Sequence, residues 1–305
     1  MVQKIREIVR SVYGKYDVWL RALGRFYLAF GSLLVIRNFM GFLPVFGNIL
    51  VLLILALLAS FLPLNGTVLI CVVVILGQLY GLSFPALAVG GGILLLVVLL
   101  YFGLAPGGAL AFLLTPLALA LHIPLVVPVA FGLLGTPLAA VGIVAGTVSY
   151  YGLQSVLQCS FVPSDASLST QELFLEEMQT MLSAFLGNGT MILTLIALTA
   201  VLIVVFTVRR TEIRYAWQMA VGTGLFIYFL LEIFGVFTLE IPVSVPDLVF
   251  GVITASVVGT VLQLFLFDLD YRSTEKLRFQ DDEYYYYVTA VPKRKQERSE
   301  DEWTQ

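Results

Sequence analysis

A long run of uncharged residues constrains this chain more than any other feature. No Asp, Glu, Lys or Arg occurs from Asn38 to Ser164, a run of 127 residues. One helical crossing of a hydrocarbon core about 30 Å thick takes ~20 apolar residues. Apolar residues form 59% of the whole chain and charged residues 12%, far from the roughly 45–50% and 25% of soluble domains. The sequence therefore predicts an all-α, polytopic bundle of transmembrane helices.

The basic residues predict how such a bundle is oriented. All 17 Lys and Arg lie at positions 4–37, 209–214 or 272–298. The positive-inside rule assigns these three regions to the cytosol. We therefore expect a plasma-membrane protein with both termini cytosolic and an even number of crossings. About eight spans fit, within a range of seven to ten, near 45–62, 67–82, 85–104, 107–122, 128–152, 190–208, 215–237 and 248–267.

Five regions follow from this pattern. They are a cytosolic or interfacial segment at 1–43, an uncharged transmembrane region at 44–157, an external segment at 158–189, a three-helix bundle at 190–268 and a cytosolic tail at 269–305.

The first region combines basic and aromatic residues. Aromatic side chains from Tyr13 to Phe26 recur among six basic ones at near-helical spacing, which is typical of an amphipathic helix in the headgroup layer. Arg37 follows after only eleven apolar residues. We therefore expect an interfacial or re-entrant element at 26–43 and no crossing there.

Prolines are concentrated in the segment from Ala105 to Val141. Each removes a backbone donor, so the helices there should be short, kinked or broken. Transporters use broken helices to direct helix ends at a substrate, but prolines also serve packing, and the sequence favours packing about two to one. The five are Pro106, Pro116, Pro124, Pro128 and Pro137.

Four polar side chains inside the predicted spans are candidates for a transport role. Glu232 is the strongest, since an ionisable group there is costly unless paired, neutral or near water. His122, the only histidine, has no nearby carboxylate in the sequence and predicts no metal site. Gln78 and Gln218 equally suit hydrogen bonds between helices.

Small residues recur every four positions on two of the last three helices. Such stripes let backbones approach closely, so these three helices should pack together, although contact with a second subunit in a homo-oligomer stays open. The stripes are Ala216, Ala220 and Gly224, and Gly251, Ala255 and Gly259.

Two segments outside the predicted spans suggest contact surfaces. Leu175, Met178, Leu182 and Phe185 would share the apolar face of a helix lying on the outer surface. In the tail, β-forming residues follow an acidic cluster. A solitary strand there could extend a sheet edge of a cytosolic partner, with docking through Tyr284, Tyr285, Tyr286 and Tyr287.

Two Asn-Gly-Thr triplets, at Asn65 and Asn188, match the glycosylation pattern. Both fall at predicted outer ends immediately before an apolar helix. Capping of the first helical turn is therefore the preferred interpretation.

The stretch YFGLAPGGALAFLLTPLALALHIPLVVPVAFGLLG and the tail FDLDYRSTEKLRFQDDEYYYYVTAVPK together give the chain a family likeness. It resembles a group of multi-pass membrane proteins of Clostridia-type bacteria to which no activity is attached. The resemblance implies a bacterial plasma membrane and nothing about chemistry.

Several functions lack their motifs. Neither GxGxxG nor GxxxxGK[ST] occurs, and one histidine with few acids offers no catalytic triad. We expect no enzyme, no cofactor and no nucleic-acid partner.

Two hypotheses for the function remain. The favoured one is a non-catalytic envelope or membrane-complex component, which assembles with partners in the bilayer. The alternative is a transporter or channel for a small solute or ion.

Overall fold

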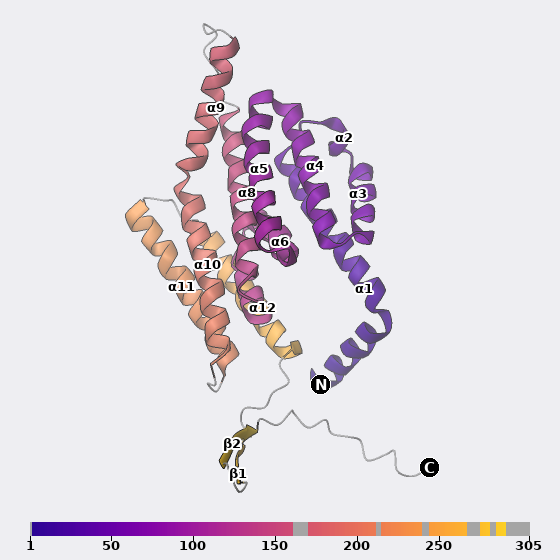
Figure 1. Ribbon diagram of the computed structural model, residues 1–305, viewed down its shortest axis with the longest axis vertical. Coiled ribbons are helices and arrows are strands. Elements are labelled where there is room, and N and C mark those ends of the chain that lie inside the picture. The colour runs from indigo at the N-terminus through magenta and orange to yellow at the C-terminus, as the bar shows by residue number, and fades with distance from the viewer. Residues whose placement is uncertain are drawn as a thin grey trace.

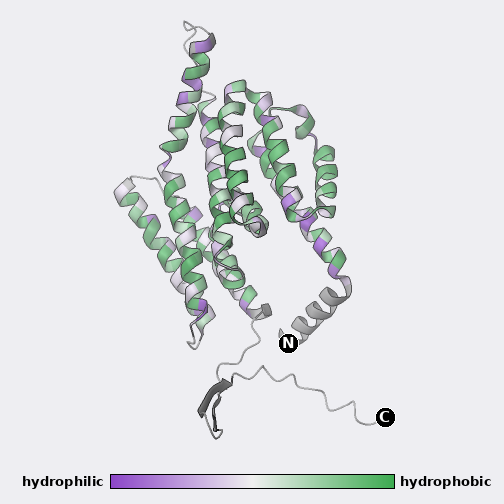
Figure 2. Ribbon diagram, viewed as in Figure 1, coloured by the Kyte–Doolittle hydropathy of each residue, from purple (hydrophilic) through white to green (hydrophobic). Residues whose placement is uncertain are grey.

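The computed structural model describes residues 2–160, 170–211, 215–239, 244–266, 275–280 and 285–290. Within these ranges, seven helical stretches are long and apolar enough to cross a membrane. They are Tyr16–Phe39, Leu64–Leu82, Phe84–Leu104, Ala139–Cys159, Leu173–Arg209, Ala216–Thr238 and Val245–Gln263. Green, hydrophobic residues dominate these helices in Figure 2.

The helices follow one another with short connections. In chain order they are α1 (Val2–Phe39), α2 (Pro44–Gly47), α3 (Ile49–Phe61), α4 (Leu64–Leu82), α5 (Phe84–Leu104), the 3-10 turn η1 (Pro106–Gly108), α6 (Ala109–Ala120), α7 (Val126–Leu134), α8 (Ala139–Cys159), α9 (Thr170–Leu186), α10 (Gly189–Arg209), α11 (Ala216–Leu239) and α12 (Val245–Leu266). Two short strands, β1 (Glu275–Gln280) and β2 (Tyr285–Ala290), complete the described elements.

The long helices run alternately between two ends of the bundle (Figure 1). We call the end that carries α9 the α9 end, and the opposite end, where α12 finishes, the tail end. Helices α1, α4, α8 and α11 run toward the α9 end, whereas α3, α5, α10 and α12 run back. Helix α3 has 13 residues, about 20 Å, and is the shortest of these eight.

Helix α1 differs from the sequence-based expectation. It is continuous from Val2 to Phe39 with one kink at Tyr16, and its apolar stretch from Tyr16 is 24 residues long. Arg37 therefore lies in the last turn of a long helix, where an extended side chain can reach polar surroundings, and it does not break the helix. The side chains of residues 1–15 lie outside the described part, so their amphipathic character stays a prediction.

The centre of the bundle holds a helical hairpin that the sequence analysis did not anticipate. Helix α6 has 12 residues and α7 has nine, about 18 and 14 Å, so neither spans a 30 Å core. The predicted spans 107–122 and 128–152 are thus replaced by two half-length arms followed by the full-length helix α8. Thr136-Pro137 separates α7 from α8, which the sequence analysis had joined.

A capping motif turns the chain at the tip of this hairpin. The N–H of Ile123 donates to the Ala118 carbonyl at 2.9 Å and the N–H of His122 to the Leu119 carbonyl at 3.1 Å. This is the Schellman pattern, which places one residue in the left-handed region. His122 occupies that position with φ of 58°, and Pro124 follows because it cannot continue α6.

Close backbone contacts fix both arms. A Cβ on Gly142 would lie 2.6 Å from the Gly108 carbonyl oxygen, and one on Gly146 would lie 2.9 Å from that of Phe112. A Cβ on Gly132 would likewise lie 2.7 Å from the Val205 side chain of α10. Helix α6 therefore packs against α8, and α7 packs against α10.

The two small-residue stripes contact different neighbours. On α11, Ala220 is fully buried and Gly224 faces Val205 of α10. On α12, Ala255 is fully buried and Gly259 faces both α11 and α7, while the Cβ direction of Gly251 points to the His122 carbonyl. The remaining member, Ala216, is also buried. The last three helices are thus joined partly through α7.

Helix α9 continues roughly in line with α10 and does not lie flat across the bundle (Figure 1). Its inner face includes Met181, which is 1% exposed, and Phe174, which stacks on Phe84 of α5. The expected apolar face is only partly right, because Leu175 and Leu182 are exposed. The other two expected residues do face the bundle, since Met178 packs against the core and Phe185 lies beside Gly152 of α8. Contact with α5 and α8 therefore rotates the packed face of α9 relative to the expected one.

The two Asn-Gly-Thr triplets lie at opposite ends. Asn188 caps α10 as expected, accepting from the Met191 N–H at 3.0 Å. Asn65 lies at the tail end and instead accepts from the Tyr101 hydroxyl at 3.0 Å, while Pro63 occupies the N-cap of α4. Because α1 runs the full length of the bundle, α3 and α4 run in directions opposite to those predicted.

Strands β1 and β2 pair antiparallel, with Glu275 opposite Ala290 and Gln280 opposite Tyr285. The tyrosine-rich segment therefore has a pairing partner within the chain, contrary to the expectation of a solitary strand. Tyr285, Tyr286 and Tyr287 lie in β2, and Tyr284 lies outside the described residues.

Candidate functional site

A polar cavity of about 220 Å³ lies above the tip of the hairpin, on the side facing the α9 end. It forms because α6 and α7 stop short of that end, while α8, α10, α11 and α12 continue past them. Leu119 and Pro124 of the hairpin and Leu193 and Leu248 supply its apolar wall. Its polar side chains are His122, Tyr151, Thr190, Thr194, Tyr228, Glu232, Ser244 and Asp247.

The structure brings together two residues that sequence reasoning kept apart. His122 Nδ1 lies 3.3 Å from Asp247 Oδ2, in the first turn of α12. The sequence analysis found no carboxylate near His122 because Asp247 is far away along the chain. Both side chains are well exposed, at 66% and 48%. The pair therefore stands at the mouth of the cavity.

Glu232 lies deeper, among hydroxyl groups. Tyr228, one helical turn earlier on α11, lines the cavity together with Glu232. Across the cavity, Tyr151 of α8 and Thr194 of α10 are 3.1 Å apart. Thr194 donates to the Thr190 carbonyl at 2.8 Å, so Tyr151 is the donor to Thr194. Glu232 therefore lines the same cavity as the hydroxyl groups of Tyr228, Tyr151 and Thr194.

The charge of the cavity favours cations. Two carboxyl groups and one histidine line it, and none of its lining residues is Lys or Arg. Arg209 and Arg210 lie at the far end of α10, beside the Phe206 ring. Low-dielectric walls strengthen the field of such carboxylates. Among the described residues, no three His, Cys, Asp or Glu side chains are placed to hold a metal ion.

The cavity is open toward the α9 end and closed toward the tail end. Thr190, Ser244 and Asp247, at the starts of α10 and α12, are at its exposed side. Below the tip, Gly132 packs on α10 and Val129 on Gly259 of α12. The hairpin therefore forms the floor of the cavity.

The other polar candidates lie elsewhere. Gln78 is fully buried and its Oε1 accepts from the Leu43 N–H at 2.9 Å, which fastens the segment after α1 to α4. Gln218 is exposed near the start of α11 and does not line the polar cavity.

The prolines all border the hairpin or lie within it. Pro106 begins η1, Pro116 lies inside α6, Pro124 follows the tip, Pro128 lies in the first turn of α7, and Pro137 precedes α8.

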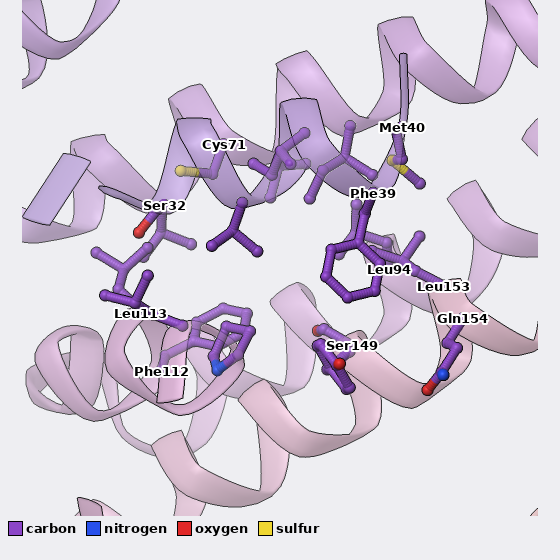
Figure 3. A pocket seen from close by; sticks show the side chains of 18 of the residues that line it. Ser32, Phe39, Met40, Cys71, Leu94, Phe112, Leu113, Ser149, Leu153 and Gln154 are labelled. Carbon is purple, nitrogen blue, oxygen red and sulfur yellow. The ribbon is translucent and has the colours of Figure 1, made fainter. Parts of the chain in front are cut away.

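A second, apolar cavity of about 100 Å³ lies on the other side of α6. Figure 3 shows Ser149 and Gln154 of α8 on one side of it and Ser32 and Cys71 on the other. Ser149 is 6% exposed, and its Oγ has no hydrogen-bond partner within the described part of the chain.

Sequence reasoning missed several residues that shape these cavities. Tyr228 could have been found as the aromatic neighbour of Glu232 at i−4, and Gly142 with Gly146 as a GxxxG pair. Asp247 and Thr194 carry no local signal, because their importance comes from tertiary contacts alone.

The fold and these cavities define a class. A bundle with seven long apolar helical stretches in its described part is the architecture of a membrane-embedded, multi-pass helical protein. Comparison with known protein families, with curated proteins and with solved structures gives no match to this chain.

Proposed function

We propose that this protein transports or conducts a proton or a small monovalent cation through the polar cavity above the hairpin. The observation that carries the proposal is the meeting of His122, Glu232 and Asp247 around one cavity whose floor is a broken helix pair. Ionisable groups at membrane depth are costly, and they occur chiefly where ions or protons pass.

The hairpin supports transport over simple packing. Non-helical backbone at membrane depth is tolerated where it is buried in protein or lines a water-filled cavity, and transporters place such breaks at their binding sites. Here the break at 121–125 lies at the floor of the cavity. Glycine and proline also flank both arms, at Pro106 to Gly108 and Gly135 to Pro137, where backbone rotation would tilt the hairpin.

Flux in reconstituted vesicles tests this function. The purified protein is placed in liposomes that contain a pH-sensitive or an alkali-cation-sensitive dye, and a gradient is imposed. We expect uptake that Glu232→Gln or Asp247→Asn lowers about tenfold or more, which corresponds to ~1.4 kcal/mol of lost cation stabilisation.

Glu176→Gln is the matched control, because Glu176 is exposed on α9 and does not line the cavity. Its flux should equal that of the unchanged protein. Liposomes that pass neither protons nor alkali cations nor small organic cations would overturn the proposal, as would full activity in the double variant of Glu232 and Asp247.

A second function, a non-catalytic component of a bacterial membrane complex, is supported by α9. Leu175, Leu182 and Leu186 are exposed along one side of this helix, where no described element covers them. Together with the tail hairpin, they offer surfaces for a membrane partner, a cytosolic partner or a second copy of the chain.

Gentle solubilisation tests this second function. We expect the protein to co-purify with a partner that is lost from a triple Leu175, Leu182 and Leu186→Ser variant or after deletion of 279–305. Purification as an isolated monomer, with growth and envelope integrity unaffected by either change, would exclude it.

A further inference from the structure

The apolar cavity lies between helices α1, α4, α5, α6 and α8 and is separate from the polar cavity. Its walls are almost wholly hydrocarbon, from side chains such as Val72, Leu94 and Phe112. It exists because α6 ends at Ala120, leaving space above it between α1 and α8. Such a cavity stays dry and takes apolar molecules.

Ser149 is the unusual residue in this wall. Ser32 and Thr147 donate to their own backbone four residues earlier, Ser32 to Leu28 at 2.9 Å and Thr147 to Ile143 at 2.8 Å. Ser149 makes no such bond, although it is almost fully buried and lines the cavity. Thr67 of α4 also has no partner in the described part of the chain, but it does not line the cavity. A buried hydroxyl group without a partner is costly, so a ligand oxygen that pairs with it gains affinity.

A water molecule fits this position poorly. An ordered buried water usually makes two to four hydrogen bonds. Besides Ser149, the polar side chains in the wall are Tyr150, Gln154 and Ser32, and Ser32 already donates its proton to its own helix; the rest of the wall is almost entirely hydrocarbon.

The ligand must be uncharged. No residue that lines the cavity is Asp, Glu, Lys, Arg or His. Burying a carboxylate or phosphate here without a partner would be prohibitive. A hydroxyl or carbonyl oxygen on an apolar chain matches both the single Ser149 hydroxyl and the hydrocarbon wall.

The cavity also has an entrance. Phe39 at the end of α1 meets Tyr150 of α8 edge to face, with ring centroids 5.4 Å apart. Phe39 is 41% exposed and Gln154 is partly exposed, and both line the cavity. A chain can therefore enter between α1 and α8 from the apolar surroundings of the bundle, past these side chains.

We propose that this cavity binds the oxygen-bearing end of a neutral, single-chain lipid, whose hydroxyl or carbonyl oxygen is hydrogen-bonded by Ser149. The cavity, about 100 Å³, holds only this end, and the rest of the chain leaves between α1 and α8. The site is independent of cation transport, because α6 and α8 separate the two cavities.

Photo-labelling tests the proposal. The full-length protein in liposomes is exposed to a long-chain alcohol with a diazirine in its chain, and labelled peptides are located by mass spectrometry. We expect labels on the segments of α1, α4 and α8 that line the cavity. Ser149→Ala should lower labelling roughly fivefold, the effect of one hydrogen bond, and Ser149→Leu should abolish it by filling the space.

Thr147→Val is the control, because Thr147 is buried on the same helix but donates only to its own backbone. It should label like the unchanged protein. Ser149→Ala, a small change, keeps the test open if Ser149→Leu fails to fold. Equal labelling by a diazirine fatty acid carboxylate, undiminished labelling in Ser149→Ala, or labels spread evenly over lipid-exposed helices would overturn the proposal.

Discussion

His122 shows how one residue combines a structural role with a candidate functional one. It holds the left-handed position that ends α6, which glycine normally takes because an L side chain there costs about 1 kcal/mol or more. A histidine in this position therefore raises the backbone free energy locally, and backbone strain of this kind tends to be found at functional sites. In this backbone conformation the His122 side chain lies 3.3 Å from the Asp247 carboxyl group.

This trade-off predicts a gain in stability when His122 is removed. His122→Gly should raise the apparent melting temperature in detergent by roughly 2 °C, because relief of the backbone cost exceeds the small contribution of an exposed contact between His122 and Asp247. The same variant should impair cation flux. Asp247→Asn is the control, since it removes the pairing but leaves the backbone unchanged. A lower melting temperature for His122→Gly than for Asp247→Asn would contradict this account.

At the scale of elements, apolar runs with clear ends could be predicted and the hairpin could not. Helices α4, α5 and α10 begin and end within a few residues of their predicted positions, because Pro, Ser or Asn marks a cap and the apolar run fills the length between. The prolines correctly predicted broken helices between 105 and 141.

The direction of those broken helices was beyond sequence reasoning. An uncharged segment gives the positive-inside rule nothing to use, so a chain that turns back half-way looks like one that crosses. The turn itself was hidden because His122, and no glycine, occupies the left-handed position. The residues of the polar cavity could likewise be predicted from the sequence only in part. Glu232 stood out by its charge, whereas Tyr151 and Thr194 became recognisable only once α8 and α10 were placed together.

At the scale of the whole molecule, a crossing by α1 would place the loops that directly follow it on the opposite side of the membrane from the one that the sequence analysis assigned. If α1 crosses the membrane, if α3 also crosses although it is only 13 residues long, and if α6–α7 forms a re-entrant hairpin, the crossings are α1, α3, α4, α5, α8, α10, α11 and α12. Their number is even, which keeps both termini in the cytosol as the basic residues predict. The connection between α3 and α4 then lies inside, and the sequence-based arrangement places it outside.

Single-cysteine labelling separates these arrangements. Cys71 and Cys159 are first replaced by alanine, and a membrane-impermeant maleimide is added to intact cells that express Leu62→Cys, Thr136→Cys or Ser183→Cys. All three positions are exposed in the structure. We expect labelling only at Ser183. Residues 62 and 136 lie in the α3–α4 and α7–α8 connections, which, like the α10–α11 connection, join helix ends directed away from α9. The positive-inside rule assigns Arg209 and Arg210, at the end of α10, to the cytosol. Labelling of Leu62→Cys from outside would mean that α1 does not cross, and it would remove the re-entrant hairpin on which the cation pathway depends.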